Sequence, residues 1–151
     1  KSSQGYTGDL AIGKGSNNQE VLVLTSAGLQ ACGGTGCPMT ANILKIKQGG
    51  GGAGMASWRA RAILDPGKYR FEGKVKVIEV LPANRSDIGA MLRVSGSKVI
   101  PQVRGASDWR SVSHDFEVQF PSDQVELVCE LACLVGEAWF DASSLRLIRL
   151  P

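Results

Sequence analysis

The side chains with the widest chemical scope in this sequence are four cysteines, one histidine and three tryptophans. The cysteines form two close pairs, Cys32 with Cys37 and Cys129 with Cys133. Neither pair has the tight Cys-x-x-Cys spacing of a zinc site, so a metal is the least favoured interpretation. We predict disulfides, which suit a secreted protein, over buried free thiols. On a continuous strand Cys129 and Cys133 would lie about 13 Å apart, so they bond to each other only if the strand ends first.

Candidates for catalysis are few. His114 alternates in register with Val112 and Phe116, which predicts a hydrogen-bonded or half-buried histidine at the core rather than a general base. The sequence holds no Gly-x-Ser-x-Gly elbow for a serine nucleophile. Glu126 and Glu130 share one strand face, but evenly spaced carboxylates on a strand usually mark a solvated surface rather than a glycosidase pair. We therefore predict a protein that is not an enzyme.

A run of five glycines within residues 48–54 is the one stretch that suggests phosphate binding. A phosphate loop needs a helix N-terminus directly after it. Here residues 55–64 alternate between apolar and polar types, which predicts a strand instead. Because glycine loses the most backbone entropy on ordering, we predict a flexible loop between two strands for residues 48–54.

Apolar and polar residues alternate at a period of two along much of the chain, which is typical of half-buried strands. No stretch shows helical periodicity, and many short polar or glycine-containing breaks separate the strands, so we predict an all-β protein. One domain spanning residues 1–151 suits this length. The predicted strands are residues 20–25, 43–47, 55–64, 69–80, 88–94, 99–103, 109–120, 125–131 and 145–148.

Composition excludes several classes of protein. The hydrophobic fraction of 43% and the charged fraction of 21% are those of a globular domain. The net charge of +3 is spread without a run of like charges, so a basic patch for nucleic acid is not indicated. No apolar run reaches the roughly 20 residues that a membrane helix needs, so we predict no membrane insertion. The abrupt ends suggest an excised domain or a mature fragment.

Several stretches resemble carbohydrate-binding-module-like β-sandwiches, the galactose-binding-like domains of secreted bacterial proteins. They are SWRARAILDPGKYRFEGKVKV at residues 57–77, a DW…F.V strand beginning at Asp108, VELVCEL at 125–131, and GEAWFD..SLRL after residue 135. The resemblance covers residues 57–149. It implies a two-sheet antiparallel β-sandwich with jelly-roll connectivity. It also implies a non-catalytic module at an extracellular, cell-surface or periplasmic location, attached to other domains of a parent protein.

A poly- or oligosaccharide is the ligand that this resemblance implies. Sugars are held by aromatic platforms and by polar side chains. Trp109 begins its strand outside the apolar register, which predicts exposure. Trp58 is in register with apolar residues, which favours the core, although the resemblance to xylan-binding modules places a ligand-stacking aromatic near it; Trp139 faces either the other sheet or solvent. The predicted ligand-binding residues are Trp109, Trp58, Arg93, Arg59 and Glu117.

No cofactor is required by this interpretation, but the resembled fold usually carries a structural calcium ion. Asp141 matches the position of a contributing carboxylate, whereas Ala142 stands where many members have a second acid. The alternative for Asp141 is an aspartate that stabilises a turn. The alternative for the whole chain is a structural or protein–protein interaction sandwich with no sugar ligand. Exposed aromatic side chains lining a groove would favour the sugar-binding hypothesis.

Overall fold

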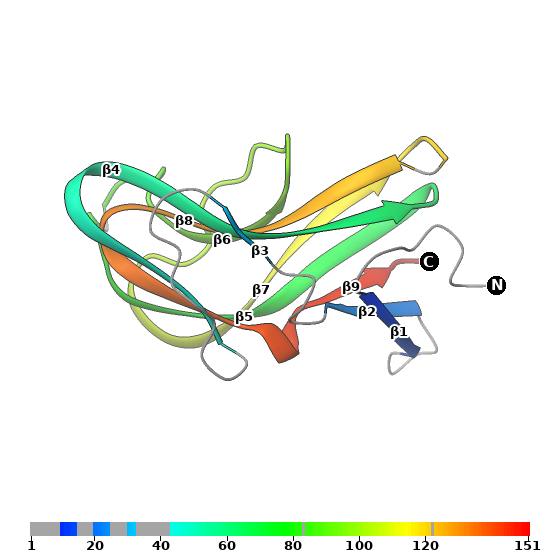
Figure 1. The fold of residues 1–151 in the computed structure, drawn as a ribbon, viewed down its shortest axis with the longest axis horizontal. Coiled ribbons are helices and arrows are strands. Elements are labelled where there is room, and N and C mark those ends of the chain that lie inside the picture. The colour runs from blue at the N-terminus through cyan, green and yellow to red at the C-terminus, as the bar shows by residue number, and fades with distance from the viewer. Residues whose placement is uncertain (1–9, 15–19, 25–29, 33–42, 83, 122) are drawn as a thin grey trace.

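A computed structural model describes residues 10–14, 20–24, 30–32, 43–82, 84–121 and 123–151 of the chain (Figure 1). These residues form nine strands and one short 3-10 helix, and every strand pairing is antiparallel. The predicted antiparallel all-β class is confirmed. The elements are β1 (Leu10–Lys14), β2 (Glu20–Leu24), β3 (Gln30–Cys32), β4 (Ile43–Leu64), β5 (Gly67–Leu81), β6 (Gly89–Val94), β7 (Gly105–Val118), β8 (Asp123–Asp141), η2 (Ala142–Ser144) and β9 (Arg146–Arg149).

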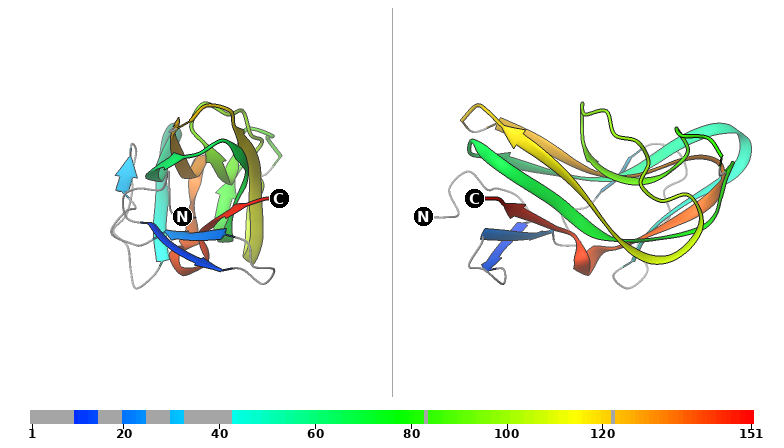
Figure 2. Two further views of the ribbon diagram at one scale, coloured as in Figure 1. Left: turned by 90° about the vertical axis from the view of Figure 1, so that its right-hand side faces the viewer. Right: turned by 180° about the vertical axis from the view of Figure 1, so that it is seen from behind.

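The two longest strands, β4 and β8, organise the sheet. They pair from Ile43 opposite Asp141 to Leu64 opposite Asp123. On the other edge of β8, β6 pairs with residues 127–132 and β5 pairs from residue 135 to residue 140. Both long strands curve at one end of the molecule from one layer of the sandwich into the other (Figures 1 and 2). A change of neighbour along β8 accompanies this bend.

Two layers face each other across the core. Layer A comprises β3, β6, residues 54–64 of β4 and residues 123–133 of β8. Layer B comprises β1, β2, β5, β7 and β9 together with the remaining halves of β4 and β8. Because β4 and β8 run through both layers, hydrogen bonding joins all nine strands into one bent sheet. The two layers of the predicted sandwich are therefore continuous with each other.

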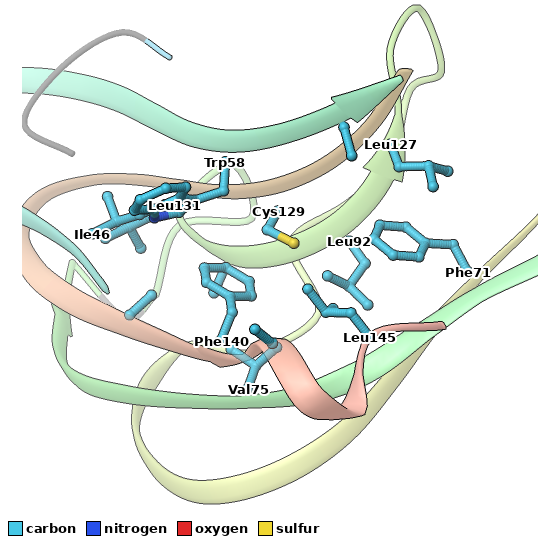
Figure 3. Packing of buried hydrophobic residues seen from close by; sticks show 14 of the residues in the cluster. Ile46, Trp58, Phe71, Val75, Leu92, Leu127, Cys129, Leu131, Phe140 and Leu145 are labelled. Atoms are coloured by element: carbon cyan, nitrogen blue, oxygen red, sulfur yellow. The ribbon is translucent and has the colours of Figure 1, made fainter. Parts of the chain in front are cut away.

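The hydrophobic core lies between the layers (Figure 3). Tyr69 and Phe71 of β5, Leu131 and Phe140 of β8, and Leu145 beside η2 are each no more than 1% exposed. These positions follow the predicted alternation, since successive residues of a strand point to opposite faces. Burying one such side chain contributes about 1.5–3 kcal/mol, so this cluster is the main source of stability.

The glycine-rich stretch predicted to be a loop is instead the middle of β4. The register between β4 and β8 shifts between Gly49 and Gly54, at the bend. Gly136 of β8 lies opposite Gln48, has a φ of 149°, and would place a Cβ 2.6 Å from the Cα of Val80. The loop prediction was wrong because the neighbouring strand holds the glycines in an extended form, while their missing side chains permit a sharp curve.

A smaller correction concerns residues 99–103, which were predicted to be a strand. They form only one isolated bridge, between Val103 and Ala90. The described residues include no helix long and apolar enough to span a membrane.

Candidate functional site

Trp58 lies in the core and is 6% exposed (Figure 3). It shares the inner face of β4 with Ala60, Ala62 and Leu64, which are also buried. The prediction of Trp58 as a ligand-binding residue was therefore wrong, because the strand register places it inward and the resemblance does not override that register.

Arg59 and Arg93 lie on the outer face of layer A, where both guanidinium groups contact carboxylates of β8. Nη1 of Arg59 donates to Oε1 of Glu126 at 2.6 Å. Nη2 and Nε of Arg93 donate to the two oxygens of Glu130 at 2.8 and 3.3 Å. The side chain of Glu130 is only 4% exposed and that of Arg93 14%. The Arg59 and Arg61 guanidinium groups hold the pKa of Glu126 below its usual range.

These ion pairs use the guanidinium groups of Arg59 and Arg93, which were predicted from the sequence to bind a ligand. Arg93 and Glu130 line a groove of about 740 Å³ together with Met91 and Pro101. Because these two charged groups satisfy each other, we interpret them primarily as a structural pair in the floor of that groove.

Glu117 occupies a different place, at the end of β7. It is exposed and lines a groove of about 650 Å³ with Phe116, Arg61 and Glu126. The five residues predicted to bind one ligand thus lie in four places. Trp58 is in the core, Arg59 and Arg93 are on the outer face of layer A, Glu117 is in the groove at the end of β7, and Trp109 is on layer B, as described next.

Trp109 is the tryptophan most open to solvent, with 38% exposure. Two residues along β7, Ser111 pairs with Lys74 of β5, and both face away from the core. Trp109 itself lies where the register between β5 and β7 shifts, between Arg110 and Ser107, and no β5 residue is paired with it. Its position two residues from Ser111 places it on the outer side of layer B, at the start of this irregular stretch. The carboxylate of Asp108 accepts a hydrogen bond at 2.8 Å from the backbone N–H of Trp109, which fixes the start of the exposed segment. The predicted exposure of Trp109 is confirmed.

A lysine and a second tryptophan lie on the same outer face. Lys76 stands between the buried residues Val75 and Val77, and it pairs across the strands with Trp139 of β8. The Nζ atom of Lys76 is 5.4 Å from the centre of the Trp139 ring, within the range of a cation–π contact. Nε1 of Trp139 donates to the carboxylate of Glu137. Cross-strand register brings these residues together, which is why the sequence alone did not reveal the contact.

The cysteines of β8 correct one prediction. Cys129 and Cys133 are buried free thiols. Because β8 continues unbroken to Asp141, these two residues stay on one extended strand and do not bond to each other. Burial raises the pKa of the Cys133 thiol to about 11. Cys37 and the side chain of Cys32 lie outside the described part of the chain, so a disulfide between those two residues stays a prediction.

Asp141 caps the short helix η2. Its Oδ1 accepts hydrogen bonds from the backbone N–H and the hydroxyl of Ser143, at 3.1 and 2.6 Å. Calcium takes six to eight oxygen ligands. No group of three or more His, Cys, Asp or Glu side chains suited to a metal exists among the residues that the structure describes. The donors around Asp141 therefore do not fit calcium by themselves, and a calcium ion there stays a prediction.

His114 lies on the inner side of β7, stacked on Phe116 with a ring separation of 6.1 Å. Its buried Nε2 has no hydrogen-bond partner among the described groups. Burial lowers the pKa of His114. Of the two predicted alternatives, a hydrogen-bonded or a half-buried histidine, the structure shows the half-buried one.

Comparison with known proteins shows the fold and no closer kinship. No protein-family model and no curated sequence matches the chain significantly. Among solved structures, the carbohydrate-binding module TmCBM61, in complex with β-1,4-galactotriose, superposes with a TM-score of 0.52. Its identity is 9%, over 98% of this chain and 93% of that one. The predicted fold, a sandwich like that of carbohydrate-binding modules, is confirmed.

Two further structures are less similar. The enzymatically active domain of tailspike protein 4 from bacteriophage CBA120 has a TM-score of 0.49 and 8% identity, over 97% of this chain and 20% of that chain. A carbohydrate-binding module of family 29 has a TM-score of 0.43 and 16% identity, over 95% of this chain and 87% of that chain.

Proposed function

We propose that this domain is a non-catalytic saccharide-binding module of a secreted or cell-surface protein, and that it binds through the outer face of layer B around Trp109. One observation carries the proposal: Trp109 presents 38% of its surface to solvent, at the register shift where β7 bulges against β5. The similarity of the fold to TmCBM61, which was solved with a galactotriose, supports the same conclusion.

The surroundings of Trp109 suit a sugar. An indole ring offers a flat apolar surface for the C–H face of a pyranose, and neighbouring polar groups bind the hydroxyls. Ser111, Lys74 and Lys76 supply hydroxyl and ammonium donors on the same face. Because β7 is hydrogen-bonded to β5 along most of its length, this surface is already formed and loses little entropy on binding.

The alternative is a structural or protein–protein interaction module that binds no sugar. One observation favours it: Trp58 is buried and the ring of Trp139 is in contact with Lys76, so neither offers an open platform. In that case other domains of a parent protein are the partners.

Calorimetric titration against neutral and acidic oligosaccharides, with and without calcium, separates these two functions. We expect saturable binding to one class of saccharide. Trp109→Ala should weaken binding about tenfold or more, a loss of about 1.4 kcal/mol, without changing the melting temperature. Phe120→Ala is the matched control, since Phe120 is an exposed aromatic just beyond the end of β7. If a folded sample binds none of the oligosaccharides, or if Trp109→Ala binds as tightly as the wild type, the proposal is contradicted.

A further inference from the structure

A polar hollow of about 230 Å³ opens on layer B, two residues along β7 from Trp109. Three cationic side chains, one carboxylate and three hydroxyls line it. They are Arg70, Lys74, Arg146, Glu72, Ser111, Ser113 and Ser144. No sequence pattern indicated this group, because its members come from β5, β7, η2 and β9.

The strand pairing brings these side chains together. On one edge of β5, Glu72 pairs with Ser113 and Lys74 pairs with Ser111. On the other edge, β9 pairs with β5 as far as Glu72 opposite Arg146, and η2 then takes its place. The backbone N–H of Lys74 donates to the hydroxyl of Ser144 at 2.8 Å. The hollow is therefore built on hydrogen-bonded backbone from both sides.

The floor of the hollow is fixed by Gly73. A Cβ at this position would lie 2.5 Å from Cδ2 of Leu145, a fully buried side chain. Leu145 thus packs directly beneath the backbone of β5. The side chains around the hollow project from a rigid support, which favours a binding site over a collapsible surface.

The cationic side chains of the hollow differ in how strongly ion pairs with neighbouring carboxylates hold them. Nε and Nη2 of Arg70 donate to the two oxygens of the Asp115 carboxylate, at 2.7 and 3.1 Å, and the two side chains are 42% and 54% exposed. Nε of Arg146 is 3.8 Å from the Glu72 carboxylate. Lys74 forms no ion pair with any described residue. Exposed ion pairs with a single contact are weak, so Arg146 and Lys74 can turn to an incoming anion at little cost. Arg70 is held more firmly by its two contacts with Asp115.

We propose that this hollow binds the anionic group of an acidic saccharide, either the carboxylate of a uronic acid or a sulfate ester, while a neighbouring sugar unit stacks on Trp109. Guanidinium forks and ammonium groups are the usual partners of such oxyanions. Trp109 and Ser111 are about 7 Å apart along the strand, a separation comparable to successive units of a sugar chain. This inference rests on the proposed function and specifies its ligand class.

Three probes of equal length test it: a neutral galacto-oligosaccharide, an oligogalacturonate and a sulfated galacto-oligosaccharide. We expect the wild-type domain to bind an anionic probe at least tenfold more tightly than the neutral one at low salt, with the preference shrinking as salt rises. Whether the carboxylate or the sulfate probe binds identifies the anion. Arg146→Gln should reduce the anionic affinity several-fold and leave the neutral affinity unchanged. Lys74→Gln should reduce the anionic affinity by a larger factor than the neutral affinity, because Lys74 also donates to sugar hydroxyls.

Lys98→Gln is the matched control for charge, because Lys98 is exposed and lines the groove in layer A instead. Melting curves confirm that each variant is folded. Equal affinity for the neutral and the anionic probes overturns this inference. If Trp109→Ala then abolishes the binding of all three probes, the proposed function still stands. A Lys98→Gln loss as large as that of Lys74→Gln means diffuse charge attraction and also overturns the inference. No binding of any probe overturns both proposals.

Discussion

The guanidinium of Arg93 donates two hydrogen bonds to the carboxylate of Glu130, at 2.8 and 3.3 Å, on the outer face of layer A. Neither side chain is more than 14% exposed. A second guanidinium, that of Arg59, lies 3.9 Å from the same carboxylate. Glu130 therefore links β4 and β6 across β8. A carboxylate this well buried is stable only because the two cations replace its hydration.

Glu130→Gln should accordingly destabilise the domain. The substitution keeps the size of the side chain but leaves Arg93 without its counter-charge, and loss of one partner of a buried pair costs about 3 kcal/mol. Urea denaturation followed by tryptophan fluorescence measures the change. Asp87→Asn, which removes the partner of Arg85 in an exposed pair, is the control and should leave the midpoint unchanged. Equal midpoints for both variants would show that the buried pair has no special weight.

Gly136→Ala should disrupt the bend of β8. The φ of Gly136 is 149°, and a Cβ would meet the backbone of Val80 at 2.6 Å, so strain and a steric clash act together. Gly96→Ala separates the two effects, because Gly96 has a φ of 90° but a Cβ added there would meet no atom within 4 Å. We expect a loss of more than about 1 kcal/mol for Gly136→Ala and a smaller loss for Gly96→Ala. Thermal melting of the two variants decides; a smaller effect at Gly136 would refute the role of this glycine in the bend.

Stability should fall when the pH drops from about 7 to about 5, because of His114. Burial lowers the pKa of this imidazole from its ordinary value of 6.5. The unfolded chain then binds the proton more tightly than the folded chain, so acidification favours unfolding. Asp115, which raises that pKa, and Arg93, which lowers it, are the charged neighbours that modulate the effect.

Melting temperatures at pH 7.5, 6 and 5 test this for the wild type and for His114→Gln. The variant should lose less stability across this interval. The arginine-paired carboxylates Asp115 and Glu126 also have lowered pKa values, so their contribution is lost at more acidic pH, below about 4.5. Identical pH profiles for wild type and variant between pH 7.5 and 5 would rule out His114 as the cause.

The thiols of Cys129 and Cys133 should resist modification in the folded protein. Burial raises the pKa of both thiols, that of Cys133 to about 11, so the reactive thiolate is scarce at neutral pH. In a Cys32→Ser/Cys37→Ser background we expect no reaction with a thiol reagent in buffer and two reactive thiols in urea. Mass spectrometry counts the labels, and rapid labelling in buffer would show that β8 opens readily.

Where the local sequence pattern decides the structure, it was a reliable guide. Alternation correctly assigned Trp58 to the core and indicated the exposure of Trp109, and it placed His114 on the inner face of β7. It misjudged residues 48–54, because glycine occurs in both loops and bends, and only the partner strand distinguishes them.

The sequence pattern did not predict which residues come together in the candidate sites. Lys76 meets Trp139, Arg93 meets Glu130, and Lys74 meets Ser144 only through pairings between segments that are far apart in the chain. Alternation fixes the face on which a residue lies but not the register between strands. The five residues first assigned to one ligand site consequently scattered over four places.

The shared course of β4 and β8 through both layers also determines how the chain reaches its native state. Every pair in their ladder, from Leu64 with Asp123 to Ile43 with Asp141, joins segments on opposite sides of β5, β6 and β7 in the sequence. Neither layer has a local nucleus of its own along these strands, and folding of such non-local sheets takes milliseconds to seconds, which is slow among small domains. We therefore expect slow folding, because the chain between β4 and β8 must close before any pair of this ladder can form.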